Sequence, residues 1–461
     1  MEEEKKLTGK SDLYSVCKSV CEEKECQLYW TRWLILAIFM VYAIAAGVQW
    51  MQYSIITNIV KEYYNVEPYE VEWTTMLHML AYVLCILPAL WMLEKAGNRI
   101  TMLTAGAGIC LGAWIKLFAV KPDSFSLVLI GQTIEAAAQV LTFGLAGSVT
   151  ASWFGPNEIA IGGSLALFGD QLGAGLGFVL PPLFVRSSVN KDDIGEGLYS
   201  LCMFITVLSS SIFIVMLIFF KDCPDKPPSH AQIVRNEIRK KGNSLADFLK
   251  MISKKSFLLM LLCYGIHIGV FCAHATLLNR TFGFYFPGHE KDGGLIGSLI
   301  IFCGLIGSII AGLFLDWKHM FKETSLVLYA CSTICMAGYT LALKSESLVL
   351  VYVIACLMGM FMFGYYSVGL QTAIELVHPY SEGISCGLML LAVQIMGLIL
   401  TPMYRYIFEI STPLEANFSL VSLLFCGVLL SMKIPPNYRR QEAERKVKDG
   451  LSAKSFIKSV E

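Results

Sequence analysis

Charged residues are scarce in this chain of 461 residues. Asp, Glu, Lys and Arg together make up 16% of it, whereas an average soluble domain carries about 25%. Hydrophobic residues make up 55%. The 36 basic residues are balanced by 36 acidic ones, so no basic excess indicates a nucleic-acid partner. This composition is typical of a protein that lies largely within a lipid bilayer.

The sequence also lacks the patterns of a cleaved leader, a metal site and an enzyme. Its start, MEEEKKLTGKSDLYS, is too polar for a signal peptide, so we expect the first spanning helix to direct insertion. Cys17, Cys21 and Cys26 have no histidine among them and fit no zinc spacing. They are either free thiols or palmitoylated. We therefore expect no metal and no cofactor. Since no nucleophile is paired with a base, we also expect no enzymatic activity.

Long apolar runs are abundant instead. A helix needs about 20 apolar residues to cross a bilayer, and we predict an all-α membrane protein with twelve spans. They lie near residues 33–59, 73–93, 100–119, 126–152, 159–184, 198–220, 256–286, 293–315, 324–343, 348–376, 383–408 and 417–432. The predicted organisation is an N-terminal tail (1–32), a six-helix half (33–220), a linker (221–255), a second six-helix half (256–432) and a C-terminal tail (433–461).

The charges of the connecting segments predict the orientation. Nine basic residues face four acidic ones in the 221–255 linker, and eight face four in the tail after Met432. The 60–72 loop has four glutamates and a single lysine. Because basic segments stay in the cytoplasm, we expect the linker and both tails to be cytoplasmic and the acidic loop to lie outside.

A sequence pattern occurs twice, once in each half. Residues 156–182 and 379–402 both begin and end with proline, are apolar and glycine-rich, and contain a glutamine fifteen positions after the first proline. These glutamines are Gln171 and Gln394, 223 positions apart. Paired repeats of this kind are typical of transporters with a site between their halves. We expect the two glutamines to meet at one central cavity.

The ends of the second and eighth spans also correspond. Glu94 precedes Arg99 in ALWMLEKAGNR, and Asp316 follows Gly312 in AGLFLDWKH, at nearly the same offset. An acid at a helix end, followed by basic residues, is expected to pair across the loop and brace two helices. The alternative is that these are ordinary helix-end charges. Their recurrence favours the transporter interpretation.

Polar residues inside the spans are the candidates for a binding site, because they are costly in lipid. In the first span, Trp50 and Asn58 are eight positions apart and lie on one face of an ideal helix. A ring suits a cation, and an amide suits a hydroxyl. The alternative is a Trp50 that packs or lies at the membrane interface. Asp170 and Gln171 are splayed by about 100°, so only one points squarely into a cavity.

Several titratable residues lie in the predicted spans as well. His78, His267 and His274 are candidates for carrying protons or ligating haem iron. The alternative is that each makes a hydrogen bond between helices. Glu135, Lys116 and Glu375 are interpreted as residues that brace helices.

Taken together, these motifs resemble a known family. The segments VQWMQYSII, GAWIK, SWFGPNE, GDQLG, ATLLN and GLFLD are similar to those of the feline leukaemia virus subgroup C receptor family, a branch of the major facilitator superfamily. The resemblance covers nearly the whole membrane region. It implies the fold of that superfamily, transport of choline and ethanolamine, and haem export as a second activity.

The resemblance also implies site residues. Family members hold the substrate's ammonium between a tryptophan of the first span and a tyrosine of the seventh, with glutamines nearby. The matching positions are Trp50, Gln171 and Gln394, and Asn58 matches a family asparagine. The tyrosine does not carry over, because Cys272 stands in its place. Asp170 stands where the family usually has an amide or a small residue.

We therefore expect a facilitator of choline, ethanolamine or a related amino alcohol, working by alternating access. The alternatives are a haem or porphyrin exporter of the same fold, and a membrane receptor or scaffold that does not transport. We expect a monomer in the plasma membrane, with an intracellular membrane as the alternative. Its expected partners are a small-molecule substrate and the lipid bilayer, with no nucleic acid.

Overall fold

The computed structural model describes residues 27–155, 158–188, 190–224, 251–318, 320–345, 347–377 and 382–435, and the single positions 226 and 228. Over these residues the secondary structure is helical. The helices are α2 (Thr31–Met51), α3 (Thr57–Tyr64), α4 (Pro68–Phe118), α5 (Phe125–Trp153), α6 (Ile159–Phe184), α7 (Lys191–Phe219), α10 (Lys255–Thr276), α11 (Leu278–Tyr285), α12 (Glu290–Lys318), α13 (Phe321–Lys344), α14 (Leu348–Val377), α15 (Glu382–Ile410) and α16 (Pro413–Met432).

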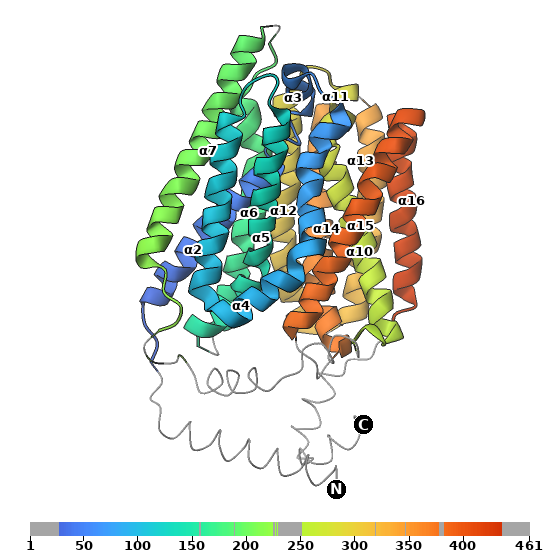
Figure 1. The fold of residues 1–461 in the computed structure, drawn as a ribbon. Coiled ribbons are helices and arrows are strands. Elements are labelled where there is room, and N and C mark those ends of the chain that lie inside the picture. The colour runs from blue at the N-terminus through green and yellow to red at the C-terminus, as the bar shows by residue number, and fades with distance from the viewer. Residues whose placement is uncertain are drawn as a thin grey trace.

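Eleven of the described helices are long and apolar enough to cross a membrane. Helix α4 accounts for the difference from the twelve predicted spans. It has 51 residues and contains a non-helical Gly97 with φ 83°, a conformation that favours glycine. At about 1.5 Å per residue it is far too long for one crossing. Figure 1 shows α4 running down, turning at its lower end and running back up. Its two arms match the predicted second and third spans.

The helices of each half pack through close backbone approaches at glycines. In the N-terminal half α2 lies against α6, and a Cβ added at Gly177 would lie 2.8 Å from the Met51 Cβ. In the C-terminal half α10 lies against α15, and a Cβ added at Gly269 would lie 2.8 Å from the Met396 Cβ. Gly47 makes the corresponding approach to the Asp170 carbonyl oxygen. Gly269 is 222 positions after Gly47, so the repeat extends to the packing.

The two halves meet mainly along two helix pairs. Helix α6 packs against α12, and α15 packs against the first arm of α4. The short helices α3 and α11 sit together at one end of the bundle (Figure 1). We call this the α3–α11 end. It carries the acidic 60–72 loop, so the predicted orientation would place it outside the cell.

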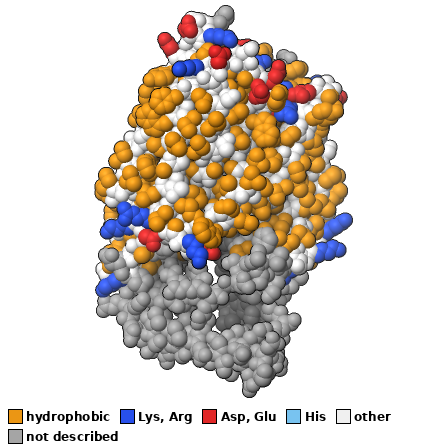
Figure 2. Space-filling view, in the orientation of Figure 1, with side chains coloured by type: hydrophobic (Ala, Val, Ile, Leu, Met, Phe, Trp, Pro, Cys, Tyr) orange, Lys and Arg blue, Asp and Glu red, His pale blue; other side chains and the backbone are white. Residues whose placement is uncertain are grey.

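The surface agrees with a membrane protein. Figure 2 shows an orange band of hydrophobic side chains around the middle of the molecule, with charged side chains mainly above and below it. Exposed apolar side chains on the long helices include Leu84 on α4, Ile214 on α7 and Leu313 on α12. Most of the linker, the two tails and the cysteines Cys17, Cys21 and Cys26 lie outside the described residues. The domain boundaries and the orientation therefore stay predictions.

Candidate functional site

The first span is interrupted just beyond Trp50. Helix α2 ends at Met51 and α3 begins at Thr57, and residues 52–56 between them form a turn that interrupts the helix. Trp50 and Asn58 therefore do not share one continuous helix face, and the argument from their spacing is wrong. The break is fixed by contacts with the other half, because the Ser54 hydroxyl donates to the Ala275 carbonyl oxygen at 2.8 Å.

Buried polar atoms without partners gather around this break. Within the described residues they include Trp50 Nε1, Gln49 Oε1, both amide atoms of Gln52 and Thr75 Oγ1. Trp50 itself is only partly buried. Buried polar groups are normally hydrogen-bonded. These atoms therefore mark positions where a ligand or a water molecule would supply the missing hydrogen-bond partner. Interrupted helices in transporters serve substrates in this way.

A chain of buried polar side chains extends from Trp50 through the N-terminal half. The Trp50 and His78 rings lie 6.2 Å apart between centroids. His78 Nε2 is 2.6 Å from Glu135 Oε2. One helical turn later on α5, Gln139 Nε2 donates to Asp170 Oδ1 at 3.0 Å. The chain therefore joins four spans, with the Glu135 carboxyl bonded to the histidine beside the candidate ring and the Asp170 carboxyl one helical turn further along α5.

Lys116 on α4 is a buried basic side chain near this chain of polar residues. It is 1% exposed and donates from Nζ to Gln132 Oε1 at 2.9 Å. Gln132 in turn donates to the Gln49 carbonyl oxygen at 2.9 Å. Lys116 lies within electrostatic range of Glu135, and a buried cation near a buried acid lowers the cost of holding that acid ionised.

The two predicted glutamines each lie on a helix face that is turned toward the other half. Gln171 is one turn before Gly175, where an added Cβ would lie 3.4 Å from the Phe302 ring on α12. Gln394 is three positions before Gly397, where an added Cβ would lie 2.9 Å from Met79 Sδ on α4. Gln394 Oε1 is buried without a partner among the described residues. That the two amides meet at one cavity stays a prediction.

Asp170 points away from Gln171, as their adjacent positions require. It is 7% exposed, and its backbone packs against Gly47 on α2. Cys272 is 4% exposed and lies beside Gly397 and Met79, at the seam between the halves. A small side chain fits that seam, and we expect a ring there to displace the neighbouring methionine.

Tyr366 on α14 is a candidate that sequence reasoning missed. It is partly buried, and it lies within electrostatic range of both Asp170 and Cys272. Its backbone is held by Tyr264, whose hydroxyl donates to the Tyr366 carbonyl oxygen at 3.1 Å. It is thus a ring from the C-terminal half near the position where the family tyrosine is missing. The only sequence feature that could have indicated Tyr366 is its position as a hydroxyl-bearing ring in an aromatic, otherwise apolar run.

The other two histidines lie in the aromatic core of the C-terminal half. His267 is 0% exposed, is 2.7 Å from the Ser332 hydroxyl, and packs on Tyr329 and Tyr365. His274 is 1% exposed and packs edge-on against Tyr339. The described residues contain no group of three or more metal-binding side chains.

The α3–α11 end is closed by contacts between the halves, which we call the gate. The Glu72 carboxylate is 2.8 Å from Arg280 and 3.5 Å from Arg405, so it joins the N-terminal half to two helices of the other half. Asn279 donates to the Ile55 carbonyl oxygen at 2.5 Å. Asn58 donates from its side chain to Glu290 at 3.0 Å. Asn58, predicted as a substrate residue, is therefore a gate residue in this conformation.

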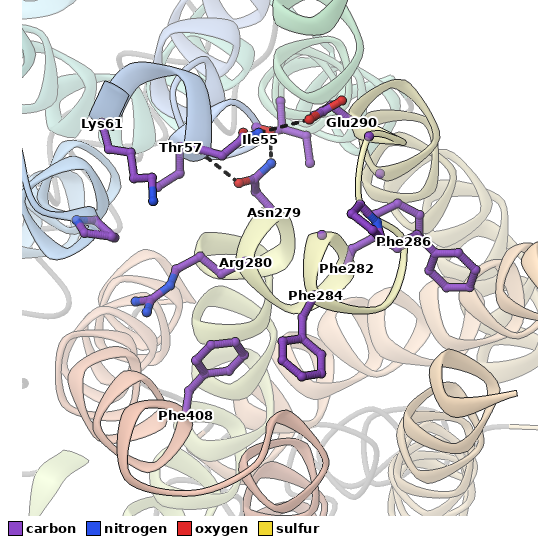
Figure 3. Close-up of a pocket in the computed structure, with 16 residues that line it drawn as sticks. Ile55, Thr57, Lys61, Asn279, Arg280, Phe282, Phe284, Phe286, Glu290 and Phe408 are labelled. Carbon is purple, nitrogen blue, oxygen red and sulfur yellow. Dashed lines mark hydrogen bonds between the residues drawn. The ribbon is translucent and has the colours of Figure 1, made fainter. Parts of the chain in front are cut away.

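A pocket of about 450 Å³ opens beside the gate at the α3–α11 end. Figure 3 shows Arg280, Glu290 and Lys61 around it, with the rings of Phe282, Phe284 and Phe408 on its other sides. Pockets that hold small ligands have about 300–1,000 Å³. Trp50, Gln171 and Gln394 do not line it, so it is a mouth above the gate and not the predicted central site.

The loop residues are arranged differently from the prediction. Arg99 donates from its side chain to the Leu217 carbonyl oxygen at 3.4 Å and from its backbone to Asp222 at 3.0 Å. Asp222, and not Glu94, thus braces the turn of α4 against the end of α7. Glu94 is exposed. A Cβ added at Gly312 would meet nothing within 4 Å, and the Asp316 side chain lies outside the description.

Comparison with known proteins gives a consistent result. The sequence pattern of the Major Facilitator Superfamily matches residues 38–401. An uncharacterized MFS-type transporter of Caenorhabditis elegans is 38% identical over 423 residues, which are 92% of this chain and 72% of that protein. The human choline/ethanolamine transporter FLVCR2 is 36% identical over 415 residues, 90% of this chain and 79% of that protein.

The solved structures agree at the level of the fold. A bacterial homolog of the human lysosomal transporter Spinster, in an inward-facing and occupied conformation, aligns with a TM-score of 0.69 at 12% identity. The alignment covers 90% of this chain and 99% of that structure. The predicted all-α fold with two six-helix halves is the fold that these transporters share.

Proposed function

The chain belongs to the major facilitator superfamily, in the family of the FLVCR choline/ethanolamine transporters, and we propose that it carries choline and ethanolamine across a membrane by alternating access. The observation that carries this proposal is the environment of Trp50. Its partly exposed ring stands beside a buried polar chain that contains Glu135 and Asp170. An aromatic face and nearby carboxylates are what an ammonium group requires.

The other predicted residues complete the proposed site. Gln171 and Gln394 would hold the substrate's hydroxyl from opposite halves. Tyr366 supplies a ring from the C-terminal half in place of the tyrosine that Cys272 replaces. A quaternary ammonium relies on ring faces, whereas a primary ammonium also donates hydrogen bonds. Asp170 therefore favours ethanolamine, and the two rings favour choline.

The gate fits the same mechanism. Contacts such as Glu72–Arg280 close the α3–α11 end, and the substrate site would be reached from that end only after they break. The acidic loop at this end supports an outer position for it, and we propose that the protein works as a monomer in the plasma membrane. Among the described residues nothing favours haem, because His267 and His274 are enclosed in the aromatic core of the C-terminal half and His78 is bonded to Glu135.

Uptake measurements test the proposal. Cells that express the chain are compared with empty-vector cells for uptake of radiolabelled choline, ethanolamine and haem, after surface expression has been matched. We expect saturable uptake of the two amino alcohols and none of haem. Haem transport without amino alcohol transport would reverse the assignment, and no transport by a surface-expressed protein would favour a receptor.

A further inference from the structure

The pocket beside the gate contains two side chains of opposite charge that have no oppositely charged partner among the described residues. They are Lys61 on α3 and Glu290 on α12, so each half of the molecule supplies one. The pocket measures about 450 Å³, a size that suits a small ligand. We propose that it is a regulatory site for a small zwitterion, a molecule that joins an anionic group such as phosphate to an ammonium group, and that this ligand holds the gate closed.

The other charges at this end are balanced by one another. Glu72 is 2.8 Å from Arg280 and 3.5 Å from Arg405, and Glu409 is 3.5 Å from Arg280. Two acids therefore offset two arginines. The charges that a ligand can compensate are those of Lys61 and Glu290.

Lys61 and Glu290 are both partly buried. Glu290 accepts a hydrogen bond at Oε1 from the neutral amide of Asn58 at 3.0 Å, which leaves its charge uncompensated. Charges that are partly removed from water are stabilised most by an opposite charge within hydrogen-bonding distance. A ligand that carries both signs satisfies the two side chains together. An inorganic anion or a simple cation would leave one of them unpaired.

Figure 3 shows the two signs of charge on different sides of the pocket. Lys61 and Arg280 lie on one side and Glu290 lies on another, while the rings of Phe284 and Phe286 form further parts of the wall. The anionic group of the ligand accepts hydrogen bonds from Lys61 and Arg280. Its ammonium group pairs with the Glu290 carboxylate, and an aromatic face in the same wall adds to the attraction for a cation.

A ligand in this pocket bridges the two halves where the gate closes. The bonds from Asn58 to Glu290 and from Asn279 to the Ile55 carbonyl oxygen cross the same boundary. When these bonds break and the end opens, Lys61 and Glu290 move apart with their halves. The ligand therefore binds the closed conformation and stabilises it. Added at the α3–α11 end, it lowers the maximal rate of uptake from that side without raising the KM, because it removes carriers and does not occupy the substrate site.

The inhibition rests on the proposed function, whereas binding is measured without it. Phosphoethanolamine is the probe. Titration calorimetry of the full-length, detergent-solubilised protein should detect its binding. In cells that express the chain, external phosphoethanolamine should lower the maximal rate of labelled choline uptake and leave the KM unraised. Inorganic phosphate lacks the ammonium group, so it should need a concentration about tenfold higher or more for the same inhibition, as expected for the loss of one charge-assisted hydrogen bond.

Variants assign the ligand to the pocket, each compared with its own uptake in the absence of phosphoethanolamine. Lys61→Gln removes the partner of the anionic group. Glu290→Gln removes the partner of the ammonium group but keeps an acceptor for Asn58. Each should raise the half-inhibitory concentration and the dissociation constant about tenfold or more, and Lys61→Gln serves if Glu290→Gln does not fold. The matched control is Lys291→Gln, at an exposed residue of α12 outside the pocket lining, which should change neither value.

The contrary outcomes are distinct. Choline uptake that phosphoethanolamine does not inhibit, with no heat of binding, would overturn the regulatory site and leave the proposed function standing. A raised KM at an unchanged maximal rate would place the ligand in the substrate site and overturn the inference as well. Parental affinity in both Lys61→Gln and Glu290→Gln would overturn the assignment to this pocket. Binding that these variants weaken, in a protein that transports neither amino alcohol, would support the site and reject the proposed function.

Discussion

At the scale of single residues, the site is built from side chains that are buried but not satisfied. Gln394 Oε1 and Trp50 Nε1 are buried without partners among the described residues, and a folded protein rarely keeps such atoms without a purpose. The carboxyl groups of Glu135 and Asp170, which belong to the same chain of polar residues, each make one hydrogen bond among the described residues. A bound substrate or a water molecule would supply the missing partners of these atoms. Substitution of these residues should therefore affect transport.

The paired glutamines give the first prediction. Gln171→Ala or Gln394→Ala removes one hydrogen bond to the substrate's uncharged hydroxyl. The cost should be about 0.5–1.5 kcal/mol, which raises the KM for choline by up to about tenfold. Uptake kinetics at matched surface expression measure it. Gln371→Ala, at a partly buried glutamine on α14, is the control and should leave the KM unchanged. An unchanged KM in a site variant would show that its glutamine is structural.

Cys272 gives a second prediction at this scale. Because it lies beside Met79 and Gly397 at the seam between the halves, Cys272→Ala should change choline affinity by less than about twofold. Cys272→Tyr restores the family's ring but has to move Met79. We expect Cys272→Tyr to raise choline affinity more than ethanolamine affinity, because a quaternary ammonium relies more on ring faces. Competition curves with both substrates measure this ratio, and a ratio equal to that of the parent protein would show that the ring does not enter the site.

At the scale of helices, the close approaches within each half hold the site in place. Helix α2 lies on α6 and α10 lies on α15 through glycines that repeat 222 positions apart, at Gly47 and Gly269. Trp50 is one turn beyond Gly47, and Cys272 is one turn beyond Gly269. The position of each candidate residue therefore depends on how closely its helix approaches its neighbour.

Substitution of these glycines should lower stability. A Cβ at position 269 would lie 2.8 Å from the Met396 Cβ and 3.1 Å from the Gly397 nitrogen. Overpacking of this kind costs about 1–3 kcal/mol, so Gly269→Ala should lower the Tm of the detergent-solubilised protein. Gly312→Ala is the control, because its Cβ would meet nothing within 4 Å. Equal melting temperatures of the two variants would contradict the proposed packing.

Sequence reasoning found the spans and the repeat but missed the break in the first span. Apolar runs and charge bias act over about 20 residues, so they register in the sequence directly. The turn after Met51 has no proline or glycine to announce it. It is held by bonds to the other half, such as Ser54 to Ala275. The His78–Glu135 pair is 57 positions apart, and only the packing of α4 on α5 brings it together.

At the scale of the whole molecule, the gate decides which end is open. Glu72 is fully buried as a side chain and is shared by Arg280 and Arg405. The carboxylate therefore stabilises the closed α3–α11 end, and its loss should favour the opposite conformation. Alternating access then becomes an equilibrium that a few contacts between the halves control.

The gate gives the fourth prediction. Glu72→Gln replaces the carboxylate by a neutral amide. It removes a hydrogen bond between charged groups that stabilises the closed gate by about 1.5–3 kcal/mol. A cysteine introduced at Thr57, which is 2% exposed, should then react with an external maleimide roughly ten- to a hundredfold faster. Glu62→Gln removes an exposed charge at the same end and should leave the rate unchanged. Equal rates for both variants would show that Glu72 does not hold the gate.

The central claim is that an ammonium group is carried over the Trp50 ring. The direct measurement is exchange of labelled choline by purified protein in vesicles, for the parent chain, Trp50→Phe and Trp50→Ala. Loss of one ring from a cation site costs about 0.5–2 kcal/mol or more. We predict exchange by the parent chain, weaker exchange by Trp50→Phe, and none by Trp50→Ala at equal thermal stability. Exchange by Trp50→Ala at the parental rate and affinity would contradict the account.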